Sequence, residues 1–302
     1  MERKKRIGDR SDGYRIKTLS PMSRVAPHIM KVRADSQNLI KSSARADAIR
    51  AYIHEKRRAG LKNFGMPHVF VAAYVRTISQ RPAINRFISG QKIFARFISG
   101  QKIFARNNVL GIMTVKTEMT LDAPDTEIKM EFPRDATAEQ IYNIFNSHTS
   151  SAKNPSSEES GFEKTARVLN YIPSIMLSAT VSVLRVMDYF GLIPKSLLAV
   201  SPFHGSFVIT SMGSLGIPPI YHHLYDFGNC PVFISYGGYR NANELEPDGT
   251  CVRRKYVDFA ITTDERICDG FYFASALKVL KTYLENPYLL DKPPDEVVYD
   301  ID

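Results

Sequence analysis

Residues 261–270 read ITTDERICDG, and this stretch decides how the C-terminal third of the chain is interpreted. Apolar residues precede it, and the run FYFASALKVLKTYLENP after it has a helical pattern. The stretch is therefore predicted at a strand-to-helix corner, with a turn at Asp269 and Gly270, where side chains can face a cleft. Glu265 lies four residues before Asp269, and both acid–base chemistry and simple solvation are open interpretations of it.

The bulk composition is that of a globular protein of one large domain or two ordinary ones, with 302 residues. Forty Lys and Arg against 31 Asp and Glu give a net charge of +9. Part of this excess lies in the opening MERKKR, and residues 1–12 are interpreted as a solvated basic tail. A basic surface is compatible with an anionic cofactor. Nucleic-acid binding is not predicted, because the chain shows neither a patterned basic stripe nor an aromatic platform.

The cysteines and the apolar segments bear on the compartment. Cys230, Cys251 and Cys268 are odd in number and widely spaced, which argues against a disulfide framework and for a reducing, cytoplasmic location. No apolar signal region follows the basic start. The stretch IPSIMLSATVSVLRVMDYFGLIP is interrupted by Arg185 and Asp188, so it is predicted as a buried or partner-facing helix and not as a membrane span.

Helices and strands are expected to alternate along the chain. An exposed amphipathic helix is predicted over 36–60 and a more buried one over 66–81, ending before Pro82. KIFAR, VLGIMTVKTEM and TEIKMEF are strand candidates rich in β-branched and aromatic residues. Thr137 and Gln140 form a capping-box pattern that predicts a helix start.

The second half is predicted to contain a mobile Ser-rich loop over 147–161, the apolar helix, three further strands and a C-terminal helix. The strand candidates are SFVIT, PVFISYGGY and RKYVDFAITT. An acidic tail over 291–302 ends the sequence.

One decapeptide, RFISGQKIFA, occupies residues 86–95 and again 96–105. A ten-residue period is too short for a solenoid repeat, so a local duplication is the better interpretation. Each copy contains a turn-like Ser-Gly-Gln between β-forming runs. The surplus copy is therefore expected to lengthen a hairpin or a surface loop.

Several common catalytic motifs are absent from the sequence. It has no phosphate-binding loop, no G-x-G-x-x-G after a strand and no G-x-S-x-G. His222 and His223 could be imagined as metal ligands with Asp226, but neighbouring residues on a strand point to opposite faces. No metal site is predicted, because recognised ligand spacing is missing.

The stretch DERICDGFYFASALKVLKTYLENP resembles the active-site segment of the chloramphenicol acetyltransferase-like acyltransferases. This family includes the catalytic domain of the dihydrolipoamide acyltransferases of 2-oxo acid dehydrogenase complexes, with the pattern His-x-x-x-Asp-Gly before a helix. LSPMSRVAPHIM, RPAINRF and SFVITSMGSLGIPP resemble other family segments in the same order. The resemblance implies a single α/β domain, a mixed sheet covered by helices.

The resemblance also implies a homotrimer with active sites between subunits. A channel there would admit coenzyme A from one end and the acyl acceptor from the other. Because no lipoyl-carrier or subunit-binding domain precedes the matching part, a free-standing acyltransferase is expected, using acyl-coenzyme A and a thiol or hydroxyl acceptor, small or carrier-bound. The alternative is a catalytically silent trimeric scaffold or binding protein with the same fold.

The resemblance assigns roles to five residues. Asp269 matches the aspartate that holds the local structure through an arginine, for which Arg24 is the candidate. Thr210, with Ser211 beside it, matches the hydroxyl that supports the oxyanion. Glu265 stands where the family has its catalytic histidine.

Glu265 is the departure that decides whether the chain is active. Moving a proton from a thiol to an ordinary carboxylate costs about 3 kcal/mol more than moving it to a histidine. Burial and the adjacent charge of Asp264 would strengthen Glu265 as a base and remove most of that difference. A Glu265 that is exposed or paired with Arg266 would remain a weak base.

Overall fold

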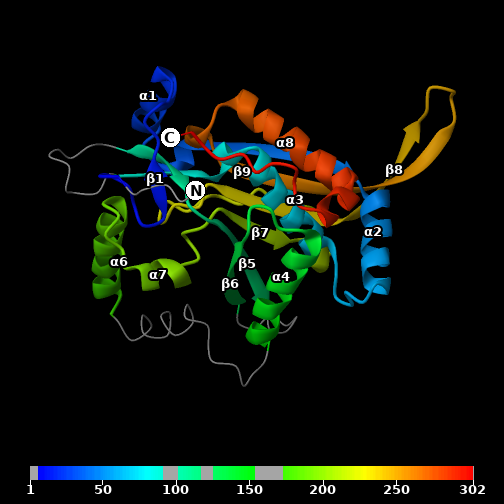
Figure 1. Cartoon of the computed structure of the whole chain (residues 1–302), viewed down its shortest axis with the longest axis horizontal. Coiled ribbons are helices and arrows are strands. Elements are labelled where there is room, and N and C mark those ends of the chain that lie inside the picture. Colours follow the sequence, from blue (N-terminus) through cyan, green and yellow to red (C-terminus); the bar gives the residue numbers. More distant parts are fainter. Residues whose placement is uncertain (1–5, 91–100, 117–124, 154–172, 302) are drawn as a thin grey trace.

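The structure is a computed structural model that describes residues 6–90, 101–116, 125–153 and 173–301. A mixed sheet forms its centre (Figure 1). Within the described residues this larger sheet has six strands, in the order β2 (Gln37–Arg45), β9 (Cys251–Asp264), β8 (Val232–Leu245), β7 (Phe207–Ser211), β5 (Val109–Lys116) and β6 (Asp125–Phe132). β7 runs parallel to both β5 and β8, and the other pairs are antiparallel. The predicted fold class is confirmed.

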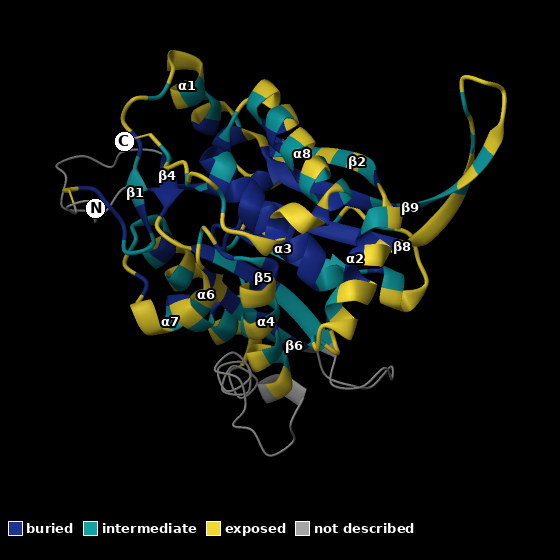
Figure 2. Ribbon diagram, turned by 45° about the vertical axis from the view of Figure 1, so that its right-hand side comes forward, coloured by how far each residue is buried: buried dark blue, intermediate teal, exposed yellow. Residues whose placement is uncertain are grey.

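Four helices cover one face of this sheet: α2 (Ala46–Arg58), α3 (Met66–Gln80), α4 (Ala138–Lys153) and α8 (Gly270–Glu285). Helix α3 lies at the centre of the molecule, buried along almost its whole length (Figure 2). Alternate strand residues such as Ile209 and Phe259 point toward the helices and form the main core with them.

A smaller sheet lies beside the larger one. Its strand order is β1 (Gly13–Arg15), β4 (Lys102–Arg106) and β3 (Arg86–Ser89), with antiparallel pairing throughout. The remaining described helices are α1 (Pro21–Ile29), α6 (Ser174–Tyr189), α7 (Lys195–Val200) and the short 3-10 turns η1 (Arg33–Ser36), η2 (Pro82–Asn85), η3 (Gly213–Leu215), η4 (Glu265–Ile267) and η5 (Pro287–Asp291).

The helix predicted over 36–60 is half wrong. Residues 37–45 form the edge strand β2, which pairs with β9 from Gln37 opposite Asp264 to Arg45 opposite Tyr256. Only 46–58 are helical. The pairing partner lies more than 200 residues away, and backbone hydrogen bonds to it override a local composition that is compatible with a helix.

The capping box at the start of α4 is confirmed in both directions. The Thr137 amide donates to Gln140 Oε1 at 2.9 Å, and the Gln140 amide donates to Thr137 Oγ1 at 3.3 Å. The helix runs on to Lys153, so the first part of the loop predicted over 147–161 is helical. Residues 154–161 lie outside the described part of the chain.

Helix α6 forms within the predicted apolar stretch but is not a buried helix. Leu177, Leu184 and Met187 are half-buried on its inner side, whereas Ile175 and Val183 are exposed. The buried interpretation is therefore wrong for a single chain, and a partner-facing role stays a prediction. Across the described ranges, none of the helices has the length and apolarity needed to span a membrane.

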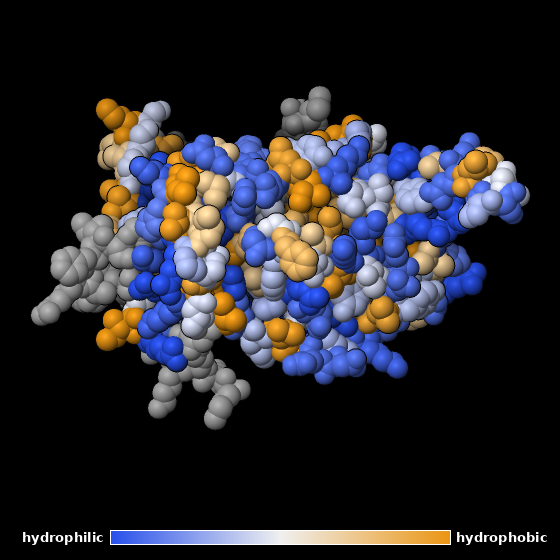
Figure 3. Space-filling model, turned by 90° about the horizontal axis from the view of Figure 1, so that it is seen from above, coloured by the Kyte–Doolittle hydropathy of each residue, from blue (hydrophilic) through white to orange (hydrophobic). Residues whose placement is uncertain are grey.

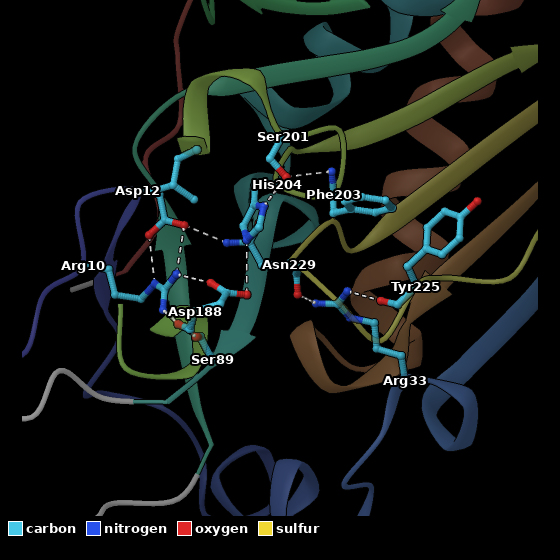
Figure 4. A network of polar contacts seen from close by, with 12 residues as sticks. Arg10, Asp12, Arg33, Ser89, Asp188, Ser201, Phe203, His204, Tyr225 and Asn229 are labelled. Atoms are coloured by element: carbon cyan, nitrogen blue, oxygen red, sulfur yellow. Dashed lines mark hydrogen bonds and ion pairs between the residues drawn. The ribbon is translucent and has the colours of Figure 1, made fainter. Parts of the chain in front are cut away.

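The predicted solvated tail over 1–12 is wrong for residues 9–12. Arg10 is only 2% exposed; its Nε lies 2.9 Å from Asp12 Oδ1 and its Nη2 lies 2.9 Å from Asp188 Oδ1 (Figure 4). Asp188 also lies 3.2 Å from His204 Nε2. A buried guanidinium needs such partners, so this network fixes the N-terminal segment against the last turn of α6.

The acidic tail also packs on the body of the protein. The Val298 amide donates to the Ser79 carbonyl at 2.8 Å. The Asp300 carboxylate accepts two hydrogen bonds from Arg86, at 2.6 and 2.7 Å.

The duplicated decapeptide is divided between two strands. β3 comes from the first copy and β4 from the second, and they pair with Arg86 opposite Ala105 and Ser89 opposite Lys102. Residues 91–100 lie outside the described residues. Because the offset between copies is an even ten residues, either copy can present the same side chains to the same face.

Deleting residues 91–100, which gives the same polypeptide as deleting 96–105, is expected to leave folding and any activity intact. Ser89 and Lys102 then flank a two-residue Gly-Gln loop, a favoured hairpin connection, and the observed register is kept. Loop closure changes only slowly with loop length, so the melting temperature should shift by less than about 5 °C. Insoluble expression of the shortened chain would show that the surplus copy is structural.

Candidate active site

The strand-to-helix corner predicted at 261–270 is confirmed. β9 ends at Asp264, a single 3-10 turn covers Glu265–Ile267, and α8 begins at Gly270. Asp269 is the N-cap of α8: its Oδ1 accepts a hydrogen bond from the Tyr272 amide at 2.8 Å. A carboxylate also suits the positive end of the helix dipole, so Asp269 fixes the direction in which α8 leaves the corner.

Asp264, not Glu265, is the buried acid of this corner. Asp264 is 1% exposed and accepts from Arg266 Nε at 2.8 Å and Arg266 Nη2 at 2.7 Å. It also accepts from Ser36 Oγ at 3.1 Å, and Arg33 Nε lies 3.7 Å away. Arg266 is thus engaged by Asp264, which is not a free negative charge beside Glu265.

Glu265 itself is exposed, and it lines one cavity together with Asp269. The cavity has a volume of about 150 Å³ and lies between the end of β9, the edge strand β2 and the first turns of α8. Phe273 and Leu277 form part of its apolar wall. The volume is below the range of roughly 300–1,000 Å³ that small-molecule sites usually have, so one chain alone does not enclose a large substrate here.

Two polar residues and one thiol that line this cavity were not predicted as site residues from the sequence: Asn38, Thr263 and Cys268. Thr263 is 2% exposed, and its hydroxyl has no hydrogen-bond partner among the described residues. A hydroxyl is a group that can donate a hydrogen bond to a developing oxyanion. Burial raises the pKa of the Cys268 thiol to about 12, so this thiol is a poor nucleophile near neutral pH.

Thr210 and Glu265 do not meet within one chain. Thr210 lies opposite Ser235 on β8, which lies opposite Ala260 on β9, five residues before Glu265. With strands about 4.8 Å apart and a rise of about 3.3 Å per residue, the separation is roughly 15–20 Å. Thr210 also follows the core residue Ile209, so its side chain lies on the sheet face opposite the helices.

The predicted pairing of Arg24 with Asp269 is not present among the described residues. Arg24 Nη2 donates to the Lys17 carbonyl at 2.5 Å, and Arg24 lines a different cavity from Asp269. Ser211 lies on the helix-covered face of β7, opposite Tyr236 in the register. One chain therefore brings Glu265 and Asp269 together and leaves Thr210, Ser211 and Arg24 elsewhere.

Solved structures of dihydrolipoamide acetyltransferases resemble this chain. A probable dihydrolipoamide acetyltransferase from Listeria monocytogenes superposes with a TM-score of 0.55 at 13% identity, covering 94% of this chain and 99% of that chain. The Azotobacter vinelandii dihydrolipoamide acetyltransferase superposes with a TM-score of 0.50 at 12% identity, covering 91% and 93%. This chain has an acyltransferase fold. The cubic core of a pyruvate dehydrogenase multienzyme complex also matches, with a TM-score of 0.50 at 13% identity and the same coverage.

No family model matches the sequence, and no curated protein matches it significantly. The likeness is therefore one of fold. In the Azotobacter vinelandii enzyme, a serine, a histidine and an asparagine have been investigated for their roles in the catalytic mechanism. The described residues of this chain contain no cluster of three or more His, Cys, Asp or Glu side chains that could hold a metal ion.

Proposed function

We propose that the protein is an acyltransferase that moves an acyl group between coenzyme A and a thiol or hydroxyl acceptor. The observation that carries the proposal is the corner itself: in an acyltransferase fold, Glu265 and Asp269 line one cavity at the strand-to-helix junction. The sequence resemblance puts Glu265 at the position of the family's general base. Because a fold alone does not determine a reaction, the proposal rests on the residues at the corner, and the acceptor is not identified.

In the proposed mechanism Glu265 is the general base. It takes the proton of the acceptor thiol or hydroxyl as that sulfur or oxygen attacks the thioester carbonyl. When the tetrahedral intermediate collapses, the carbon–sulfur bond breaks and the proton passes from Glu265 to the departing coenzyme A sulfur. Asp269 has a positioning role through the cap of α8, and Thr210 donates to the oxyanion.

A second copy of the chain would complete this site. Thr210 is too far from Glu265 within one chain to act on the same substrate. Phe271, beside the cavity at the start of α8, is 89% exposed. Seen from above, the molecule presents several apolar patches among hydrophilic residues (Figure 3). Covering Phe271 with a neighbouring subunit would remove apolar surface from water and would shield Glu265, making its carboxylate a stronger base.

The expected assembly is a homotrimer. Exposed apolar residues on α6, such as Ile175, Val183 and Val186, and the two-stranded arm at the tip of β8 and β9 (Figures 1 and 2) are further surface available for contacts between copies. Sedimentation at micromolar concentration should give three times the chain mass. A monomer at that concentration would rule out a site shared between subunits.

The second candidate is a silent scaffold or binding protein with the same fold. The exposure of Glu265 in one chain favours it, because an exposed carboxylate is a weak base for a thiol. Release of coenzyme A thiol from acetyl-coenzyme A, measured with a dithiol and with hydroxyl acceptors, separates the two. Turnover that is absent with every acceptor while the trimer is intact would favour the scaffold.

A further inference from the structure

A second cavity, of about 320 Å³, lies between the end of β1, helix α1 and the start of β4. It is separate from the cavity at Glu265 and shares no lining residue with it. Its described lining residues are Arg15, Ile16, Lys17, Leu19, Ser23, Arg24, Pro27, His28, Gln101, Lys102 and Ile103. Its volume lies within the range of small-molecule sites.

The charge of this cavity is of one sign. Four of its described lining residues are Lys or Arg, His28 is a fifth basic side chain, and none of the lining residues that the structure describes is Asp or Glu. Burial, and then the nearby charges of Arg15 and Arg24, lower the pKa of Lys102. These cations are therefore close enough to repel one another, and a bound anion would relieve that repulsion.

The cationic side chains come from elements that are held in place. Arg24 is tied to the strand-side wall by its hydrogen bond to the Lys17 carbonyl at 2.5 Å. Gln101 donates to the Lys31 carbonyl at 2.8 Å and accepts from Arg266 Nη1 at 3.2 Å. The wall next to Lys102 is thereby connected to the buried Asp264 corner, which limits how far the cations can move apart.

Another cavity, of about 300 Å³, also contains cations but differs in charge balance. Arg106, Lys129 and Lys195 line it together with the carboxylates of Asp12 and Glu131. Its lining residues therefore carry charges of both signs, unlike those of the cavity between β1, α1 and β4.

We propose that the cavity between β1, α1 and β4 binds a small polyanion through its phosphate groups. Arg and Lys side chains suit phosphate oxygens because they make charge-assisted hydrogen bonds, and several of them around one cavity favour a ligand with two or more phosphates over a single carboxylate. The site does not depend on whether Glu265 is catalytic. Both free polyphosphates and the phosphate-bearing end of coenzyme A have the required chemistry.

Calorimetric titration of the full chain with pyrophosphate at low ionic strength tests the site. The double variant Arg24→Gln/Lys102→Gln should bind at least ~10-fold more weakly than the wild type. The matched control, Arg185→Gln/Lys278→Gln, removes one Arg and one Lys from exposed positions outside the cavity and should stay within about twofold. Equally weakened pyrophosphate binding in both variants would show that binding depends on diffuse surface charge, which would contradict a specific site. The proposal would also be overturned if the wild type did not bind pyrophosphate.

Parallel titrations with coenzyme A and with 3′,5′-ADP identify the source of the phosphates. Weaker binding of both in the site variant, but not in the control, assigns the cavity to the nucleotide end of the cofactor. Pyrophosphate binding with no effect of the site variant on either nucleotide assigns it to a free polyphosphate. Both double variants change the net charge by the same amount, so a difference between them does not come from total charge. Thermal unfolding without ligand shows whether either variant has lost its fold.

Discussion

Glu265→Gln is expected to abolish acyl transfer while leaving the fold unchanged. The substitution removes the proton acceptor and nearly keeps the shape of the side chain. Glu265 is exposed and its neighbour Arg266 is bound to Asp264, so no ion pair of the corner is lost with it. Turnover of acetyl-coenzyme A and the unfolding midpoint should be measured on the same preparation. An unchanged rate would exclude Glu265 as the base.

The reciprocal change, Glu265→His, sharpens this prediction. Proton transfer from a thiol to a histidine costs about 3 kcal/mol less than transfer to a carboxylate. The rate with a thiol acceptor is therefore expected to rise by up to ~10². Thr210→Ala should lower turnover by about 10²–10³ if its hydroxyl supports the oxyanion. Thr263→Ala, at the unpartnered hydroxyl of the cavity, is the comparison: a larger loss there than at Thr210 would move the oxyanion role to Thr263.

Asp264→Asn is expected to destabilise the fold by about 3–5 kcal/mol, because it leaves the buried guanidinium of Arg266 without its negative partner. Arg33, 3.7 Å from the same carboxylate, loses a compensating charge as well. Arg33 would keep its hydrogen bonds to the carbonyls of Tyr225 and Gly228. These acceptors are uncharged, so they offset only part of the lost stabilisation. Urea unfolding monitored by circular dichroism measures the difference.

Two neighbouring substitutions are the controls for Asp264→Asn. Asp269→Ala removes the cap of α8 and should cost about 1 kcal/mol. Glu265→Gln should stay within about 0.5 kcal/mol of the wild type, as surface substitutions usually do. If Asp264→Asn costs no more than Asp269→Ala, the buried ion pair does not hold the corner together.

Elements with strong local signals could be predicted from the sequence. The capping box at Thr137, the buried helix before Pro82 and the corner at Asp269 are each specified by residues within a few positions of one another. The sequence could not predict that residues 37–45 form the strand β2, because this strand depends on pairing with β9, more than 200 residues away. The buried Arg10 could not be predicted either, since its partner Asp188 lies far along the chain.

In the candidate site, too, features set by neighbouring residues could be predicted and features set by distant residues could not. The four-residue spacing of Glu265 and Asp269 is local, and the structure places both at one cavity. Which acid of the corner is buried was not evident: Asp264 and Glu265 are adjacent, and only the positions of Arg266 and Arg33 decide that Asp264 points inward. The distance from Thr210 to Glu265 depends on the order of the strands, which no local pattern contains.

The central claim is that Glu265 of one chain and Thr210 of another form one site. Co-assembly of two variants, each inactivated at one of these residues, tests it most directly. Glu265→Gln and Thr210→Ala, co-expressed with different tags and purified as mixed trimers, should recover about a third of wild-type acetyl-coenzyme A turnover, since about one interface in three of every trimer that holds both variants pairs an intact Glu265 with an intact Thr210. Turnover no greater than the mean of the two separately assembled variants would contradict a site shared between copies.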